Sequence, residues 1–406
     1  MAAEPPASTT ETTPQEADLR ATVEALAAVD RAPNSPGERE AAEWIAARLE
    51  RAGCTARIEE ERSYESYARP LAGLSALGAA AGLIALTRRG RAAAAVGAAA
   101  IAAAMADDIS NGPRLFRRVT MHQKPTWNVV AEAGDRDADR TLVLLAHHDA
   151  APTGLAFDQT FQRALAEAFP GIVERIDTGI PQWWPVVASP ALVALGAATA
   201  RRGFARVGLV GCLLATAAFA DIASSPVSPG ANDNLTGVAS LAAVAEALRD
   251  QPVPGLRVLL VSCGSEETLQ GGIRSFAARH FPALDRERTW VLNFDTVGSP
   301  ELILLEGEGP LVMEDYHARS FRDQVARVAE RAGVPMRRGM RARSSTDSVI
   351  PSRAGYPTAT LASMDRHKAL SNYHQMTDTP ENVDYRTVSR AVALAHALIR
   401  ELAAPG

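Results

Sequence analysis

Two adjacent glutamates, Glu266 and Glu267, follow the apolar run 256–261. A run of large aliphatic residues that gives way to small ones predicts a buried strand entering a loop. Carboxylates at such a place are costly to bury without partners, and a solvated surface loop is the simplest explanation of the pair alone. The same pair also suits metal-assisted hydrolysis, in which one carboxylate holds a metal and its neighbour moves a proton.

Four further stretches carry side chains of the same chemical kind. His147 and Asp149 follow the predicted strand 141–146, and this spacing suits a metal ligand whose ring is oriented by a nearby carboxylate. The other candidates are Asp233 in a turn before a predicted helix, Asp295 at the end of a predicted strand, and His374 in a polar loop. Three of the five stretches lie at carboxyl ends of strands, where open α/β sheets place their sites. Nitrogen and carboxylate ligands without thiolates favour a hydrolytic zinc pair.

In order and spacing, these motifs resemble those of the co-catalytic di-zinc aminopeptidase family, which also holds glutamate carboxypeptidases and glutaminyl cyclases. The resemblance covers most of the chain outside two apolar insertions. It rests on His-x-Asp at 147–149, Gly-Ala-Asn-Asp-Asn at 230–234 with Gly237, Glu-Glu at 266–267, Asn-Phe-Asp at 293–295 with Gly298, and Tyr-His at 373–374.

The resemblance implies two zinc ions per chain and a role for each matched side chain. One zinc would be held by His147 and Asp295 and the other by Glu267 and His374, with Asp233 bridging the two. Glu266 would be the general base that deprotonates the metal-bridging water, and Asp149 would support His147. The resemblance also implies a cis peptide bond after Asp233 and an α/β/α fold with a mixed, largely eight-stranded sheet.

Two residues depart from the family pattern without removing an implied ligand. Ser265 replaces the usual glycine before the glutamate pair. In Thr346-Asp347-Ser348, the serine stands where many members have histidine or tyrosine. A ring that helps polarise the scissile carbonyl in those members is therefore absent at Ser348.

Outside the insertions, strands and helices alternate along the chain. This alternation predicts an α/β fold of three layers, α/β/α, with a mixed, largely parallel central sheet. Predicted strands are 55–61, 127–133, 141–146, 257–261, 289–294, 302–306 and 358–363, and the predicted helices are 19–27, 38–52, 235–248, 319–332 and 385–402.

The chain divides into a tail and one interrupted domain. Residues 1–18 are acidic and rich in Pro and Thr, which predicts a disordered tail and not a signal peptide. The peptidase domain would span 19–404, interrupted by apolar helical hairpins at 70–108 and 183–223.

Each hairpin consists of two uncharged limbs joined by an arginine-bearing tip. The limbs are 71–87 with 92–106 and 185–200 with 207–220. At 14–17 residues each, a limb would span about 21–26 Å, just short of the roughly 30 Å hydrocarbon core of a bilayer. Trp183, Trp184, Tyr64 and Tyr67 flank the limbs, where aromatic residues of the membrane interface belong. The sequence thus favours membrane insertion and leaves soluble or dimer-forming arms as the alternative.

The sequence predicts a zinc-dependent exopeptidase, an aminopeptidase acting on peptides, that is held to membrane lipid by both hairpins. A carboxypeptidase or glutaminyl cyclase of the same family stays open, as does a catalytically silent membrane scaffold. A net charge of −5 gives no reason to expect nucleic acid, and the three scattered cysteines do not form a disulfide framework. The missing signal peptide and the unpaired cysteines favour a cytoplasmic catalytic domain, while the oligomeric state stays open.

Overall fold

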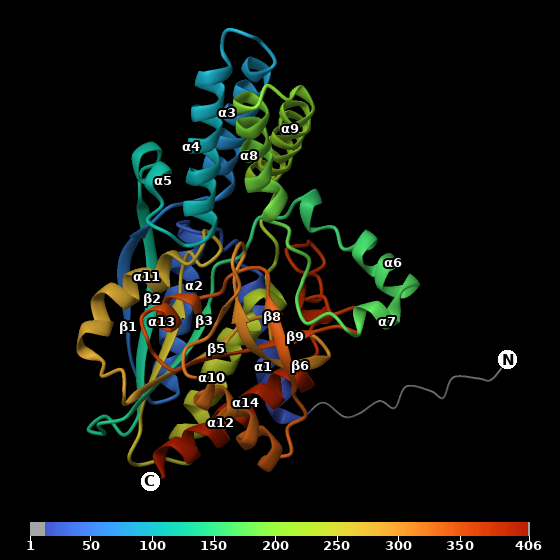
Figure 1. The fold of residues 1–406 in the computed structure, drawn as a ribbon. Helices are drawn as coiled ribbons and strands as arrows, with labels where there is room; N and C mark the ends of the chain where they lie inside the picture. The colour runs from blue at the N-terminus through green and yellow to red at the C-terminus, as the bar shows by residue number, and fades with distance from the viewer. Residues whose placement is uncertain (1–12, 405–406) are drawn as a thin grey trace, which may run out of the picture.

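The computed structural model describes residues 13–404 and consists of a main body with four helices standing away from it (Figure 1). The body is built on a nine-stranded sheet of order β1-β2-β4-β3-β5-β9-β6-β7, with β8 paired to β6. Its strands are β1 Thr55–Ser63, β2 Lys124–Gly134, β3 Thr141–His147, β4 Arg257–Cys263, β5 Thr289–Phe294, β6 Glu301–Glu308, β7 Glu314–Asp315, β8 Arg337–Ala342 and β9 Thr358–Met364.

Strand direction changes from the centre of the sheet to its edges. β4, β3, β5 and β9 run parallel, whereas β1 and β2 on one side are antiparallel to their neighbours. On the other side β6 is antiparallel to β9 and parallel to β8. The predicted mixed sheet is confirmed, with its parallel pairing concentrated at the centre, and it has one strand more than the eight that the resemblance implied.

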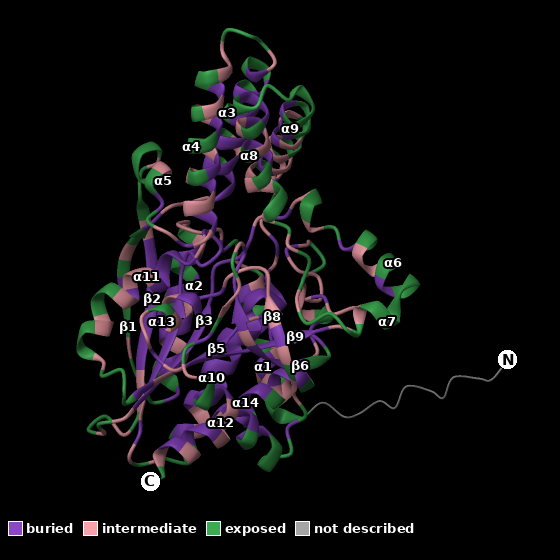
Figure 2. Ribbon diagram, in the orientation of Figure 1, coloured by how far each residue is buried: buried purple, intermediate pink, exposed green. Residues whose placement is uncertain are grey.

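Helices cover both faces of the sheet, so the predicted three-layer fold is confirmed. Strand β3 shows why both faces are covered: Leu142 and Leu144 join one apolar core, while Val143 and Leu145 join the other. Figure 2 shows the buried residues concentrated in this sheet and its covering helices. One face is covered by α1 Pro14–Ala27, α2 Pro36–Arg51, α10 Thr236–Asp250, α12 Arg319–Arg331 and α14 Tyr385–Ala403, and the other by α11 Gly271–His280 and α13 Val349–Arg353.

The start of α1 corrects the predicted boundary of the tail. Residues 14–18 are helical, and Thr13 is the residue that caps the helix. The Thr13 hydroxyl accepts a hydrogen bond from the Glu16 N–H at 3.2 Å, and the Glu16 carboxylate accepts one from the Thr13 N–H at 3.1 Å. The prediction was wrong here because Thr, Pro and Glu, which suggested disorder by composition, are also the residues that begin a helix. Residues 1–12 of the predicted tail lie outside the described residues.

The two apolar insertions form four helices that pack on one another: α3 Ala68–Ala85, α4 Arg91–Ile109, α8 Trp184–Ala198 and α9 Arg202–Ser224. We call these four helices the arms. α3 lies directly against α9, because a Cβ atom at Gly78 would be 2.8 Å from Cys212 Sγ and one at Gly82 would be 2.9 Å from Leu209 Cβ. By length and composition α3, α4 and α9 are able to cross a membrane, while α8 is shorter.

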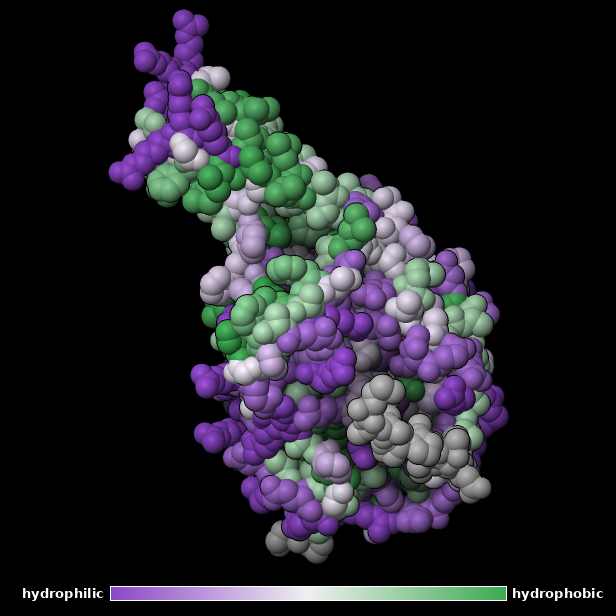
Figure 3. All heavy atoms as spheres, turned by 90° about the vertical axis from the view of Figure 1, so that its right-hand side faces the viewer, coloured by the Kyte–Doolittle hydropathy of each residue, from purple (hydrophilic) through white to green (hydrophobic). Residues whose placement is uncertain are grey.

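The outer surface of the arms is apolar up to tips that carry arginines (Figure 3). Val96 is 73% exposed and Leu214 67% exposed, values that are unusual for large aliphatic side chains in water. Of the aromatic residues at the base of the arms, Tyr67 is buried against Trp183 and Phe219, whereas Trp184 is 50% exposed.

Candidate metal centre

The parallel centre of the sheet brings the candidate residues to one edge. His147 is the last residue of β3 and lies in register with Cys263 at the end of β4, which leads to Glu266 and Glu267. Asp295 directly follows β5, the other neighbour of β3. Asp233 comes from the turn before α10, and His374 from the loop between β9 and α14.

All five predicted ligands lie together around Asp233. Its Oδ1 is 3.2 Å from His147 Nε2, and its Oδ2 is 3.3 Å from His374 Nε2. Ligand atoms of His147, Asp233 and Asp295 lie within 4.8 Å of one another, and so do those of Asp233, Glu267 and His374. The two groups share Asp233, which offers one oxygen to each, as a carboxylate bridging two metals requires.

The peptide bond between Asp233 and Asn234 is cis, as the resemblance implied.

The donor set fits zinc better than a network of protein hydrogen bonds. Both ring nitrogens of His374 are buried without a hydrogen bond of suitable angle, although Asp233 and Glu267 oxygens lie within 3.3 Å of Nε2. Among residues 13–404, no lysine or arginine forms an ion pair with any of the four carboxylates of the site, which are Asp233, Glu266, Glu267 and Asp295. Clustered carboxylates in a buried place need positive charge, and two histidines with three carboxylates are a donor set that zinc accepts.

Burial and mutual charge shift the acidities of the site. Burial raises the pKa of Glu266 well above its usual value, raises that of Glu267, and raises that of Asp295 to about 6. Burial acts in the same direction on Asp233, but the two facing histidines outweigh it and hold the Asp233 pKa below its usual value. Burial thus disfavours the charged forms of Glu266, Glu267 and Asp295, and a metal ion bound beside them would favour those charged forms.

Asp149 supports both the ligand His147 and the glutamate pair. Its two carboxylate oxygens accept hydrogen bonds from the backbone N–H groups of Glu266 and Glu267, each at 3.0 Å. Its carbonyl oxygen is 3.2 Å from His147 Nδ1. This contact leaves His147 Nε2 directed at Asp233. Asp149 thus lies beside His147, as the resemblance implied, and also anchors the loop of the proposed base.

Asp378 and Asn234 hold the turn that carries Asp233. The carboxylate of Asp378 accepts from the backbone N–H of Asn232 at 2.8 Å and of Asp233 at 3.1 Å. The Asn234 side chain donates to the Phe294 carbonyl at 2.8 Å. Asp378 lies in the same polar loop as His374 but was not predicted as a site residue.

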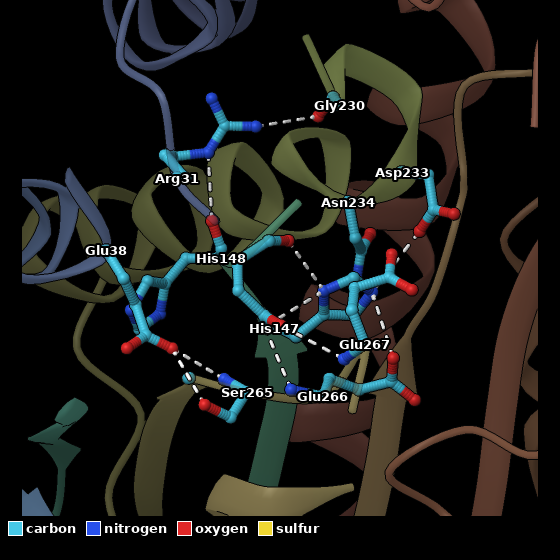
Figure 4. A network of polar contacts seen from close by, with 12 residues as sticks. Arg31, Glu38, His147, His148, Gly230, Asp233, Asn234, Ser265, Glu266 and Glu267 are labelled. Carbon is cyan, nitrogen blue, oxygen red and sulfur yellow. Dashed lines mark hydrogen bonds and ion pairs between the residues drawn. The ribbon is translucent and has the colours of Figure 1, made fainter. Parts of the chain in front are cut away.

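Two further buried charged residues reach the site, Arg31 from the turn between α1 and α2 and Glu38 from the first turn of α2, and neither was predicted as a site residue (Figure 4). The Arg31 guanidinium donates to the carbonyls of His148 at 2.9 Å and Gly230 at 3.3 Å. Glu38 accepts from the Ser265 N–H at 2.7 Å. Ser35 and Glu38 have the spacing of a helix-capping pair. This spacing predicts a role for Glu38 at the start of α2, but it does not predict the hydrogen bond with Ser265.

A cleft opens over these candidate ligands, lined by side chains of the body and of the arm bases. Phe157 packs edge-on against the His374 ring, with 4.4 Å between the ring centres. Ser348 is buried, its hydroxyl is hydrogen-bonded to that of Thr360 at 2.6 Å, and it is not among the residues that line the cleft. Besides the site residues, the lining includes Tyr67, Trp183, Gln270, Arg343 and Tyr373.

Solved structures with the same fold include exopeptidases. BSAP, a zinc aminopeptidase from Bacillus subtilis, is 13% identical with a TM-score of 0.56, covering 97% of this chain and 96% of its own. The aminopeptidase from Aneurinibacillus sp. strain AM-1 is 13% identical with a TM-score of 0.55, covering 96% and 94%. A glutaminyl cyclase from Bacteroides thetaiotaomicron is 13% identical with a TM-score of 0.54, covering 95% and 97%. The fold is thus one that zinc aminopeptidases and a glutaminyl cyclase share.

A model of peptidase family M28 matches residues 215–399, which include every candidate ligand except His147. The comparison with curated proteins gives no match. With the fold and the family model in agreement, the resemblance to the co-catalytic metallopeptidase family is confirmed.

Proposed function

We propose that this chain is a di-zinc aminopeptidase in which Glu266 is the general base. The observation that carries the proposal is Asp233, whose two oxygens face one histidine each at 3.2 and 3.3 Å. Bound zinc supplies a Lewis acid that lowers the pKa of water and polarises a carbonyl. His147 and Asp295 would hold one ion, Glu267 and His374 the other, with Asp233 between them.

Glu266 is placed to move the proton. Its Oε2 is 4.0 Å from His147 Nε2, and its Oε1 is fixed by a hydrogen bond from Gln270 at 2.7 Å. Held in this way, the carboxylate takes the proton of the attacking water and passes it to the leaving amine. A carboxyl group whose pKa is raised by burial is suited to both halves of that transfer near neutral pH.

A panel of peptides tests the aminopeptidase assignment. The zinc-loaded full chain is expected to release the first residue from peptides with a free N-terminus, whether the C-terminus is free or amidated, and to leave N-acetylated peptides intact. Mass spectrometry of the products identifies the bond that is cut. Cleavage that requires a free C-terminus would contradict an aminopeptidase and indicate a carboxypeptidase.

One observation favours the carboxypeptidase as the second candidate. Arg343 lines the cleft, its Nε is buried without a hydrogen bond, and among residues 13–404 it has no ion pair. Its guanidinium lies 5.5 Å from the centre of the Trp184 ring. Guanidinium groups bind carboxylates through paired hydrogen bonds, so a C-terminal carboxylate would fit here. Wild-type cleavage that is restricted to peptides with a free C-terminus, together with its loss in Arg343→Gln, would support this candidate.

We also propose that the arms insert into a membrane. The exposed aliphatic side chains of α9 and its length of 23 residues, about 35 Å as a helix, support this proposal. The arginine tips and the half-exposed Trp184 at the base fit the two interfaces of a bilayer. The alternative is that the arms associate in water with those of a second copy of the chain.

The membrane proposal predicts that the purified full chain floats with phosphatidylcholine vesicles. Serine substitutions at four exposed sites of α9, Val207, Val210, Leu213 and Leu214, are expected to abolish flotation because they remove the apolar surface that the bilayer would cover. The matched control carries serine at Phe161, Phe169, Ile172 and Ile176, which are similarly exposed but lie outside the arms. This control variant should float normally. A wild-type chain that is a stable monomer in water without detergent would contradict insertion.

A further inference from the structure

The base of the first hairpin is joined to the loop that carries Glu266 through a buried arginine. Past the end of α4 the chain forms the short helix α5 Leu115–Thr120, which contains Arg117. Its side chain is completely buried and pairs with Asp108 of α4, with Nε 3.1 Å from the carboxylate. The same guanidinium donates to the Thr268 carbonyl at 2.7 Å. Arg114 similarly donates to the Leu269 carbonyl.

A second path continues to the carboxylate of Glu266 itself. Asn111, between α4 and α5, donates to the Ser345 hydroxyl at 2.9 Å. That hydroxyl lies 3.3 Å from the side-chain oxygen of Gln270, whose amide nitrogen donates to the Ser345 carbonyl at 2.8 Å and to Glu266 Oε1 at 2.7 Å. Gln270 is 1% exposed, so no bulk water replaces these bonds if they are lost.

The loop between β4 and α11 needs such support because its backbone is strained. Ser265, Leu269 and Gln270 have φ values of 50°, 72° and 61°, in the left-handed region that residues other than glycine rarely adopt. Such conformations persist only where surrounding contacts hold them. Here Glu38 and Asp149 hold the first half of the loop, and the base of the hairpin holds the second half.

We propose that Gln270 is a positioning residue for the general base, and that the base of the first hairpin, through Asn111 and Arg117, holds it in place. The hairpin is then a structural part of the active site in addition to any role in a membrane. This inference rests on the proposed function of Glu266. The hydrogen bond to Oε1 leaves Oε2 as the oxygen that faces His147 and is free to accept a proton.

The test uses the full chain with zinc bound and four single variants. Gln270→Leu, the isosteric Gln270→Glu and Asn111→Ala are expected to lower kcat about tenfold or more while KM and two zinc ions per chain are retained, because only the placement of the base changes. Arg118→Gln is the control, since Arg118 is exposed on the same α5 helix. The double variant with Asn111→Ala and Gln270→Leu should lose no more than Gln270→Leu alone, because both act through one carboxylate.

Hydrogen–deuterium exchange of the peptide covering 264–271 supplies a readout that does not depend on catalysis. Faster exchange there in Asn111→Ala, but not in Arg118→Gln, is expected. Wild-type kcat together with wild-type exchange in the Asn111 and Gln270 variants would overturn the proposal. If the wild-type chain hydrolyses no peptide, the proposed function fails, and the exchange measurement still decides whether the hairpin holds the loop.

Discussion

Glu266→Gln is expected to lower turnover by orders of magnitude while two zinc ions stay bound. Glutamine has nearly the same shape as glutamate and keeps the carbonyl oxygen that accepts from Gln270, but its amide takes no proton from water. General bases contribute about 10²- to 10⁴-fold to rates, so kcat should fall within that range. Two quantities are measured: kcat for hydrolysis of an N-terminal peptide bond, and zinc content by atomic emission.

The neighbouring residue provides the matched comparison for this prediction. Glu267→Gln removes an oxygen that lies 3.2 Å from His374 Nε2, so this variant should lose zinc from one site as well as activity. A near-normal rate in Glu266→Gln would show that another group is the base. Equal zinc loss in the two variants would show that the two glutamates do not have the separate roles proposed.

Asp233→Asn is expected to empty both metal sites at once. Its carboxylate belongs to the ligand group of His147 and Asp295 and also to that of Glu267 and His374, and asparagine keeps its shape while removing the charge. Each ligand change normally affects one ion, whereas this change weakens two. Zinc content should fall from two ions per chain to well below one at micromolar free zinc, with hydrolysis lost in parallel.

Asp158→Asn serves as the control for Asp233, because Asp158 also lines the cleft but is exposed to solvent. It should keep both ions and most of the activity. Retention of one full equivalent of zinc in Asp233→Asn would contradict a bridging role. The melting temperature without zinc should be measured in both variants, so that loss of the fold is separated from loss of the metal.

The sequence was most informative where burial and function coincide. The predicted strand 289–294 matches β5, and the run 141–146 differs from β3 by one residue, because continuous apolar residues flanked by polar ones leave few alternatives. Once the strands were placed, the polar residues at their ends could be identified as candidate site residues. Asp295 stands out directly after an apolar strand in a way that a surface aspartate does not.

Other parts of the fold follow from long-range contacts that a local pattern does not contain. Strand β8 has the sequence Arg-Arg-Gly-Met-Arg-Ala, which has no apolar alternation and becomes a strand through its pairing with β6. Judged from the sequence alone, Arg31 and Glu38 resemble the ordinary surface residues that are found near the ends of helices. Their partners, Gly230 and Ser265, are far along the chain, so only the folded structure shows that they act on the site.

The position of β4 between β2 and β3 has a consequence for how the chain folds as it is synthesised. β2 and β3 emerge from the ribosome one after the other, yet they do not pair with each other. The strand that joins them comes only after the whole second hairpin has been made. Two apolar strands therefore wait with unpaired edges during that interval, a state prone to wrong pairing and aggregation. If the hairpins enter a bilayer during synthesis, β2 and β3 are held beside its surface until β4 arrives.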